Sequence, residues 1–417
     1  MSGEKRIPGL DGIRALSILL VVLGHVSYGV TAWSQYGGFG VEAFFVLSGF
    51  LITWLLCTEE DKRGDISLPS FYARRSLRIL PPAFLYIASV SLLGVLGLAD
   101  LAPNEPLYSA FFVRNLMAKG GLHLGHFWSL AIEEQFYLLW PVVFLILRSD
   151  RRRLAFTTVL IVAAPFWRHT MYSVAGGAMW VNSGRFDLRY DALMVGCCLA
   201  LIRHDGKFRQ LAVNPVIKST PAGLVALGAI VAGCAGLPMR ALSSSLSLIG
   251  VAAFINHAVE CPEGMIGSFL NWRPMMWVGQ LSYSLYLWQQ IFCWHSKLPW
   301  LGQFPQNIIA AFAAAAFSYY LLEKPLADVR RRVPYLSNPK LVYRVIEPSA
   351  QRAGLLATPS MEDTASQTLT RAAAGSGRRF GIRPAITDDV LKLLNAVRSE
   401  QSNQPEIREV NGESLHS

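Results

Sequence analysis

The sequence predicts an all-α protein that crosses a membrane about ten times, and three observations carry this prediction. Of its 417 residues, 52% are hydrophobic and only 16% are charged, and the mean hydropathy is +0.34. This composition is too apolar for an ordinary soluble domain. Apolar runs of about 20 residues, the length that a helix needs to cross a bilayer, recur along most of the chain. Basic residues are concentrated between alternate runs, as in cytoplasmic loops.

Ten runs reach spanning length. They cover residues 11–30, 41–57, 80–98, 127–147, 154–173, 188–203, 217–236, 241–259, 276–296 and 304–322. The first run follows Lys5 and Arg6, as the apolar part of a signal peptide would, but Asp11 and Arg14 interrupt its start and nine further runs come after it. We therefore expect it to be retained as the first membrane helix.

The distribution of Lys and Arg predicts the side of the membrane on which each loop lies. Segments that follow every second run are basic, and the first of them contains Lys62, Arg63, Arg74, Arg75 and Arg78. The loops at the opposite ends contain few basic residues. Because positive loops stay in the cytoplasm, both termini are predicted to be cytoplasmic. The net charge of +10 follows from this topology and does not indicate nucleic-acid binding.

The composition changes beyond residue 335, where Ser, Thr, Ala, Gly, Arg and Glu dominate and no run of spanning length occurs. We expect a transmembrane domain over residues 1–334. Residues 335–417 are predicted to form a mostly disordered cytoplasmic tail.

The six cysteines follow no spacing typical of metal ligands or disulfides. They are Cys57, Cys197, Cys198, Cys234, Cys261 and Cys293. Most lie in apolar runs as small hydrophobic residues, so the sequence predicts no metal site.

Arg14 and His25 are the first candidates for a functional site. They lie eleven residues apart in the first run, so on a helix they project the same way, separated by roughly 16 Å along the axis. An ionisable group inside a membrane is costly unless it faces a partner or a water-filled cavity. Arg14 alone could be a helix-end anchor, and His25 could be satisfied by a neighbouring helix. We favour a functional role for the pair.

Two acids are predicted at a depth similar to that of His25. Glu42 lies at the outer entrance of the second run, and Glu133 lies roughly 10 Å inside the fourth, followed by Glu134 and Gln135. Either Glu42 or Glu133 could orient the histidine. A hydrogen-bonded clamp between helices explains each acid equally well.

Arg74, Arg75 and Arg78 form a basic stretch beside the third run. On a helix Arg75 and Arg74 lie three and four residues before Arg78, so the guanidinium groups can converge on one anion. The planar fork of arginine suits phosphate. The alternative is a topological signal that binds lipid headgroups.

Seven short motifs follow one another along the chain. They are IPGLDGIRALSILLVVLGH, GVEAFFVLSGFLIT, FYARRSLRILPP, FWSLAIEEQFYLLWP, RYDALMVGCCLA, LSYSLYLW and LEKP. From about Ile7 to Pro325 the chain resembles the membrane-bound acyltransferase type 3 family. The resemblance implies a multi-pass enzyme of the bacterial inner membrane that transfers an acyl group, most often acetyl from acetyl-CoA, to a carbohydrate hydroxyl of an exopolysaccharide, O-antigen or lipo-oligosaccharide.

The resemblance also implies roles for single residues. Arg14 and His25 match the essential arginine and histidine of the family, and Arg74, Arg75 and Arg78 fall on its cytoplasmic arginine motif, which favours phosphate binding. Two positions depart from the family pattern. Glu42 stands where an aspartate is usual, and Gln289 stands where a histidine is common, which weakens the case for proton transfer at that position.

The expected chemistry starts from the acyl-CoA co-substrate. Arg74, Arg75 and Arg78 hold its phosphates, Arg14 marks the lower part of its path, and His25 acts as general base on the acceptor hydroxyl. Glu133 or Glu42 would orient the imidazole. An acyl-histidine intermediate stays open. The expected partners are a glycan or glycolipid acceptor, acyl-CoA and membrane lipids, with no metal and no nucleic acid, and a homo-oligomer stays open.

Two other functions fit the same residues. Acylation of a lipid or a small antibiotic differs only in the acceptor. A proton-coupled transporter or flippase would use His25, Glu42 and Glu133 as a proton relay and Arg14 as an anion site.

Overall fold

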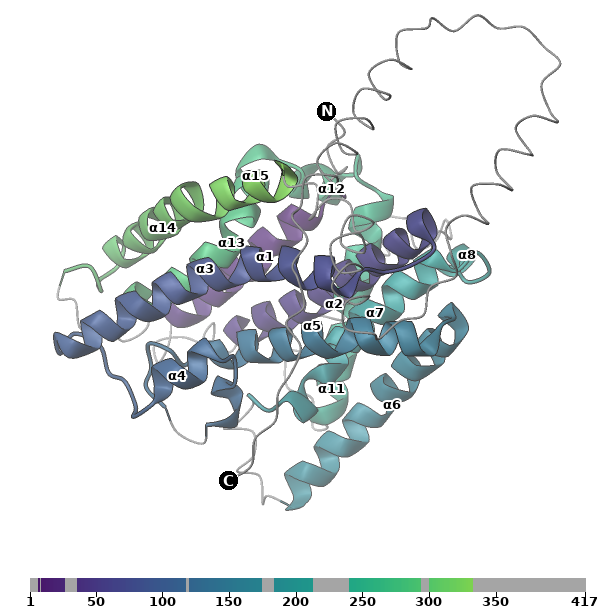
Figure 1. Ribbon diagram of the computed structural model, residues 1–417, viewed down its shortest axis with the longest axis horizontal. Helices are drawn as coiled ribbons and strands as arrows, with labels where there is room; N and C mark the ends of the chain where they lie inside the picture. The colour runs from purple at the N-terminus through teal and green to yellow at the C-terminus, as the bar shows by residue number, and fades with distance from the viewer. Residues whose placement is uncertain are drawn as a thin grey trace, which may run out of the picture. The chain divides into compact units, whose positions relative to one another are not determined.

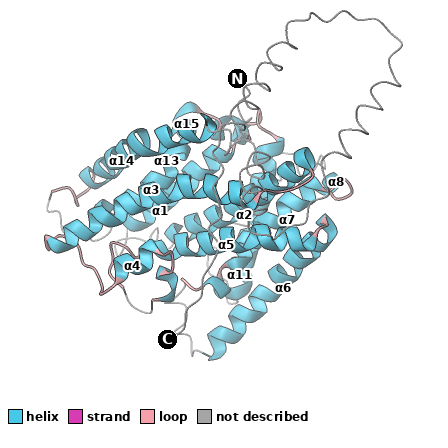
Figure 2. Ribbon diagram, in the orientation of Figure 1, coloured by secondary structure: helices cyan, strands magenta, loops and turns pink. Residues whose placement is uncertain are grey.

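The computed structural model describes residues 7, 9–26, 36–117, 120–174, 184–212, 240–293 and 300–332. Within these ranges every regular element is a helix and none is a strand (Figures 1 and 2), which confirms the all-α prediction for this part of the chain. The predicted span over 217–236 and the predicted tail over 335–417 lie outside the described residues.

The principal helices in chain order are α1 (Leu10–Val26), α2 (Tyr36–Arg63), α3 (Leu68–Val95), α4 (Glu105–Ala110), α5 (Phe127–Leu147), α6 (Asp150–Val174), α7 (Tyr190–His204), α8 (Arg209–Ala212), α11 (Arg240–Glu260), α12 (Met265–Leu270), α13 (Arg273–Cys293), α14 (Gln306–Ser318) and α15 (Lys324–Arg332). Short 3-10 turns occupy Arg114–Leu116 and Phe186–Leu188, and a π-helical turn over Tyr319–Glu323 joins α14 to α15.

Three helices of the described part, α2, α3 and α5, are long and apolar enough to cross a membrane. They correspond to the predicted spans over 41–57, 80–98 and 127–147. Helices also lie at most of the other predicted spans, but the number of ten spans and the orientation of the termini stay predictions.

Helix α3 begins twelve residues before the apolar run that predicts it. Ser67 caps the helix, its Oγ accepting a hydrogen bond from the Ser70 amide at 3.5 Å, and a proline occupies the first turn, where its missing amide hydrogen is not needed. The helix then continues through Pro81 and Pro82. As a result, the arginine stretch and the apolar run form one helix.

Helices α2 and α7 approach each other at two glycines. A Cβ on Gly49 of α2 would lie 2.0 Å from the carbonyl oxygen of Leu193 in α7, and a Cβ on Gly196 of α7 would lie 1.9 Å from the carbonyl oxygen of Val46 in α2. No side chain fits at either distance. The two backbones are therefore in direct contact, as at small-residue interfaces of membrane helices.

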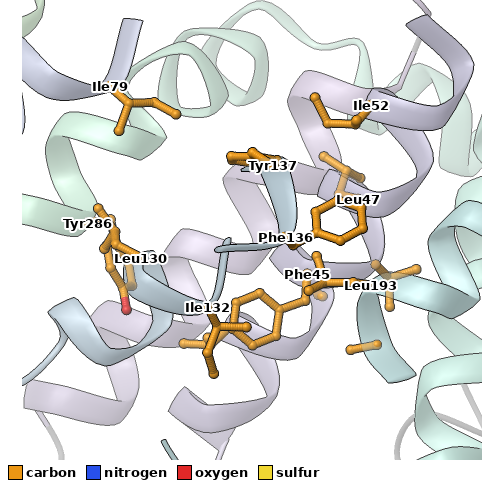
Figure 3. Close-up of a cluster of buried hydrophobic side chains, with 14 of the residues drawn as sticks. Phe45, Leu47, Ile52, Ile79, Leu130, Ile132, Phe136, Tyr137, Leu193 and Tyr286 are labelled. Carbon is orange, nitrogen blue, oxygen red and sulfur yellow. The ribbon is translucent and has the colours of Figure 1, made fainter. Parts of the chain in front are cut away.

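The buried core joins helices that are distant in the sequence. Figure 3 shows Phe45 from α2, Ile132 from α5, Leu193 from α7 and Tyr286 from α13 in one cluster of buried side chains. Helix α1 packs along α13 and α2. This packing places α1, which carries Arg14 and His25, beside the helices that carry the other candidate residues.

Candidate active site

His25 lies in the last turn of α1 and is held by a residue of α13. Its Nδ1 lies 2.7 Å from Oε1 of Gln289, which is fully buried. Because an amide oxygen can only accept, this hydrogen bond requires the proton on Nδ1. The unprotonated nitrogen of the neutral ring is then Nε2, so the contact selects one tautomer.

Gln289 is itself fixed by its neighbours. Its Nε2 donates to the Tyr286 carbonyl at 3.4 Å and to Oε1 of Gln290 at 3.3 Å, and Gln290 donates to the Leu122 carbonyl at 2.8 Å. These contacts orient the amide so that its oxygen faces His25. The sequence expectation that a carboxylate orients the histidine has no counterpart in this hydrogen bond, whose acceptor is an amide.

Arg14 lies near the other end of α1. Its Nη1 is 3.2 Å from Oδ1 of Asp11, one turn earlier, and its side chain is 22% exposed. The guanidinium therefore has an acidic partner on its own helix. This contact lowers the cost of an arginine in an apolar helix.

Glu42 forms an ion pair with Arg189, the residue that precedes α7. A second ion pair involves Asp191 of α7, two residues after Arg189. Nη1 of Arg168 in α6 lies 2.7 Å from Oδ2 of Asp191. The four charged groups join α2, α6 and α7. This geometry matches the interhelical clamp considered for Glu42.

Glu133 belongs to a chain of contacts that reaches the arginine motif. Its Oε1 accepts a hydrogen bond from Ser48 of α2, and the same Ser48 hydroxyl accepts one from the Tyr137 hydroxyl at 3.0 Å. The Arg75 guanidinium stacks over the Tyr137 ring, 3.8 Å from its centroid. The structure thus connects Glu133 with Arg75, two residues that the sequence analysis placed in separate clusters.

The three arginines of α3 have different surroundings. Arg74 donates from Nη2 to Oε2 of Glu59 at 3.0 Å. Arg75 lies on Tyr137, and its Nε is buried with no hydrogen-bond partner among the described residues. Arg78 is exposed. The structure therefore places them on one helix, with Arg74 engaged by a carboxylate and Arg75 retaining an unused donor.

His126 is a candidate that the sequence analysis missed. It immediately precedes α5, only 5% of its surface is exposed, and both of its ring nitrogens are buried without a hydrogen-bond partner in the described part of the chain. The ring lies edge-on against the rings of Tyr86 and Tyr286, with centroids 5.3 and 5.4 Å away. A buried polar group without a partner is costly, so each one calls for an explanation.

The two histidines share one supporting helix. Tyr286 of α13 contacts the His126 ring and donates from its hydroxyl to the His126 carbonyl at 3.2 Å. Gln289, which holds His25, lies three residues further along α13, and side chains at this spacing lie on the same face. The only sequence signal for His126 is its place directly before the motif that contains Glu133.

Comparisons with known proteins identify the family of the chain. Residues 7–323 match the family model described as an acyltransferase domain. The chain is 30% identical over 361 residues to YrhL of Bacillus subtilis (strain 168), covering 78% of this chain and 55% of that protein. It is 29% identical over 313 residues to the peptidoglycan O-acetyltransferase OatA of Listeria monocytogenes serovar 1/2a, covering 68% of this chain and 49% of the relative.

A third relative is the O-acetyltransferase OatA of Staphylococcus aureus (strain NCTC 8325 / PS 47), 28% identical over 353 residues, with 78% of this chain and 58% of the relative covered. The chain spans about half the length of the curated relatives it matches. No solved structure matches it. The family model covers the residues of all seven motifs except the last two of LEKP, and so the chain belongs to the membrane-bound acyltransferase type 3 family.

Proposed function

We propose that this protein transfers an acetyl group from acetyl-CoA to a hydroxyl of a bacterial cell-envelope carbohydrate, with His25 as general base. The observation that carries the proposal is the contact of His25 Nδ1 with Gln289, because it leaves Nε2 as the basic nitrogen. The name of the Listeria relative, a peptidoglycan O-acetyltransferase, makes peptidoglycan the first acceptor to test.

The proposed reaction is a direct acyl transfer. Nε2 of His25 takes the proton of the acceptor hydroxyl while the oxygen attacks the thioester carbonyl. The tetrahedral intermediate then collapses, the C–S bond breaks, and the leaving CoA thiolate takes the proton back from the imidazolium. The products are the acetyl ester and CoA. The Gln289 oxygen stabilises the imidazolium by accepting from Nδ1.

The α3 arginines are proposed to bind the donor. Arg75 offers a guanidinium with an unused Nε, and Arg78 is exposed, whereas the Glu59 carboxylate competes for Arg74. Phosphate oxygens of CoA are suitable acceptors for such donors. Arg14 would contact the donor between its phosphates and the thioester. With the orientation predicted from the loop charges, the donor enters from the cytoplasm.

The two glutamates act through other residues in this proposal. Glu133 and Ser48 position Tyr137, and Tyr137 supports Arg75. Glu133 is therefore a positioning residue for the donor-binding arginine. Glu42 holds Arg189 and with it the start of α7.

The test is turnover by the purified full chain in nanodiscs. CoA release from acetyl-CoA is followed with a thiol reagent, with a soluble peptidoglycan fragment as acceptor, and acetyl-CoA binding is measured by calorimetry. His25→Ala should abolish turnover and leave donor affinity nearly unchanged, because it removes an interaction made in the transition state.

His169→Ala is the matched control, since His169 is exposed on α6. This variant should keep the wild-type turnover rate and the wild-type affinity for acetyl-CoA. A folded His25→Ala protein that turns over at the wild-type rate would overturn the assignment of the base. Absence of acetyl-CoA binding to the wild-type protein would overturn the assignment of acetyl-CoA as the donor and favour the transporter alternative.

A further inference from the structure

Three helix segments that are distant in the sequence bring a thiol, a carboxylate and an imidazole together. Cys57 lies in α2, Asp150 is the first residue of α6, and His204 is the last residue of α7. One candidate ligand atom from each residue lies within 4.8 Å of the others, and Cys57 is fully buried. None of these residues takes part in the proposed acyl transfer.

The imidazole of His204 is held between two carboxylates. Its Nδ1 lies 2.7 Å from Oδ2 of Asp150, and its Nε2 lies 2.8 Å from Oδ2 of Asp61 in α2. The ring is therefore oriented from both sides. When a histidine binds a metal through one nitrogen, its other nitrogen typically donates to a carboxylate in this way.

Acidic groups outnumber basic ones around the cluster. Arg153 donates from Nη1 to Asp150 Oδ1 at 2.9 Å and contacts both carboxylate oxygens of Glu60 at 2.6 and 2.9 Å. This guanidinium thus pairs with two carboxylates, those of Glu60 and Asp150, while the third carboxylate, that of Asp61, contacts His204. The Oδ2 atom of Asp150 is not used by Arg153 and points to His204. A divalent cation would offset the remaining negative charge.

The donor set selects the kind of cation. Thiolate, imidazole and carboxylate together are ligands of zinc and related transition metals, whereas calcium and magnesium take oxygen ligands. Bond lengths of about 2.0 to 2.3 Å place the ligand atoms of a tetrahedral zinc site about 3.3 to 3.8 Å apart. The side chains need to shift by only a fraction of an ångström to about one ångström to reach this spacing.

We propose that Cys57, Asp150 and His204 bind one divalent transition-metal ion of the zinc class, with Asp61 as the carboxylate that orients His204. On binding, the Cys57 thiol loses its proton to solvent, a sulfur–metal bond forms, and no electron is transferred. Water completes the four ligands. The ion ties the ends of α2, α6 and α7 together and has a structural role.

Without a metal, the same residues would form only an ion-pair clamp in which a protonated His204 bridges two acids. Cys57 separates these two interpretations, because the clamp makes no use of its sulfur. The experiment therefore depends on a signal that comes from a sulfur–metal bond.

The test uses the full chain, purified with a tag that contains no histidine and stripped with a chelator. After incubation of the stripped protein with Zn²⁺, we expect it to retain one equivalent of the ion through desalting, measured by elemental mass spectrometry. We also expect Co²⁺ to give a thiolate-to-cobalt charge-transfer band. Cys57→Ser should lose the band, and His204→Gln should lose stoichiometric retention. Asp61→Asn should keep the band and weaken binding about 10- to 100-fold.

Cys293→Ser is the matched control, because Cys293 is also a buried free cysteine and lies in α13. It should keep both signals. The His204 side chain is 20% exposed, so His204→Gln still tests the site if Cys57→Ser does not fold. Failure of the wild-type protein to retain the metal, or retention with no charge-transfer band, would overturn the proposal and leave the clamp.

Discussion

Replacing Gln289 with leucine should separate orientation of His25 from binding of the donor. The substitution nearly preserves volume but removes the oxygen that lies 2.7 Å from His25 Nδ1. The buried N–H then lacks its acceptor, at a cost of about 1–3 kcal/mol. The ring also loses the contact that selects its tautomer. If this cost appears in the transition state, kcat falls about 5- to 150-fold while KM for acetyl-CoA changes little.

Two further variants make this prediction refutable. Gln289→Glu keeps an oxygen acceptor and should retain more turnover than the leucine variant, whereas a purely structural role would make the buried carboxylate at least as harmful. Gln303→Leu changes an exposed amide and serves as the control. Initial rates of CoA release give kcat and KM for each protein. Wild-type kcat in a folded Gln289→Leu protein would refute the orienting role of the amide.

Three other predictions follow from the site and its surroundings. His126→Phe should lower turnover at least tenfold with an unchanged or higher melting temperature, because phenylalanine can keep the contacts with Tyr86 and Tyr286 and removes two buried nitrogens without a hydrogen-bond partner; a wild-type rate would show that His126 only fills space. Arg75→Gln should raise KM for acetyl-CoA about ten- to hundredfold, and Arg74→Gln should have a smaller effect because Glu59 engages Arg74; equal effects would contradict this division. Burial disfavours the charged form of the Asp187 carboxylate, but hydrogen bonds from Arg185 and Trp167 outweigh this effect and lower its pKa. The contact therefore stabilises the fold at neutral pH, and this stabilisation is lost as the pH falls through the depressed pKa, below the usual range of an aspartate. The fluorescence of Trp167, obtained by subtracting the Trp167→Phe spectrum, should change in that range and not in Asp187→Asn.

The sequence predicted the helices and the principal ionisable residues for physical reasons that act locally. An arginine and a histidine in an apolar run are costly wherever the helix packs, so Arg14 and His25 could be proposed as site residues without a structure. The first residue of α3 was harder to predict from the sequence. Its first turns are polar and basic, and hydropathy alone detects only the apolar part after residue 80.

The partners of these residues depend on packing between distant segments. Gln289 lies 264 residues from His25, and Arg189 lies 147 residues from Glu42. No periodicity in a single run relates such pairs. His126 was missed because one histidine before an apolar run resembles an ordinary helix boundary, and only its buried, unpartnered nitrogens distinguish it.

The close approach of α2 and α7, with Gly49 against Leu193 and Gly196 against Val46, limits how these two helices can move. Because the backbones of α2 and α7 touch there, neither helix can tilt toward the other about this point, and separating them would open a void in the core. We therefore expect α2 and α7 to move together as one unit, with Ser48 near the middle of α2 and His204 at the end of α7. If His25 is the base, as proposed, we expect an opening that admits a bulky acceptor to come from helices other than α2 and α7.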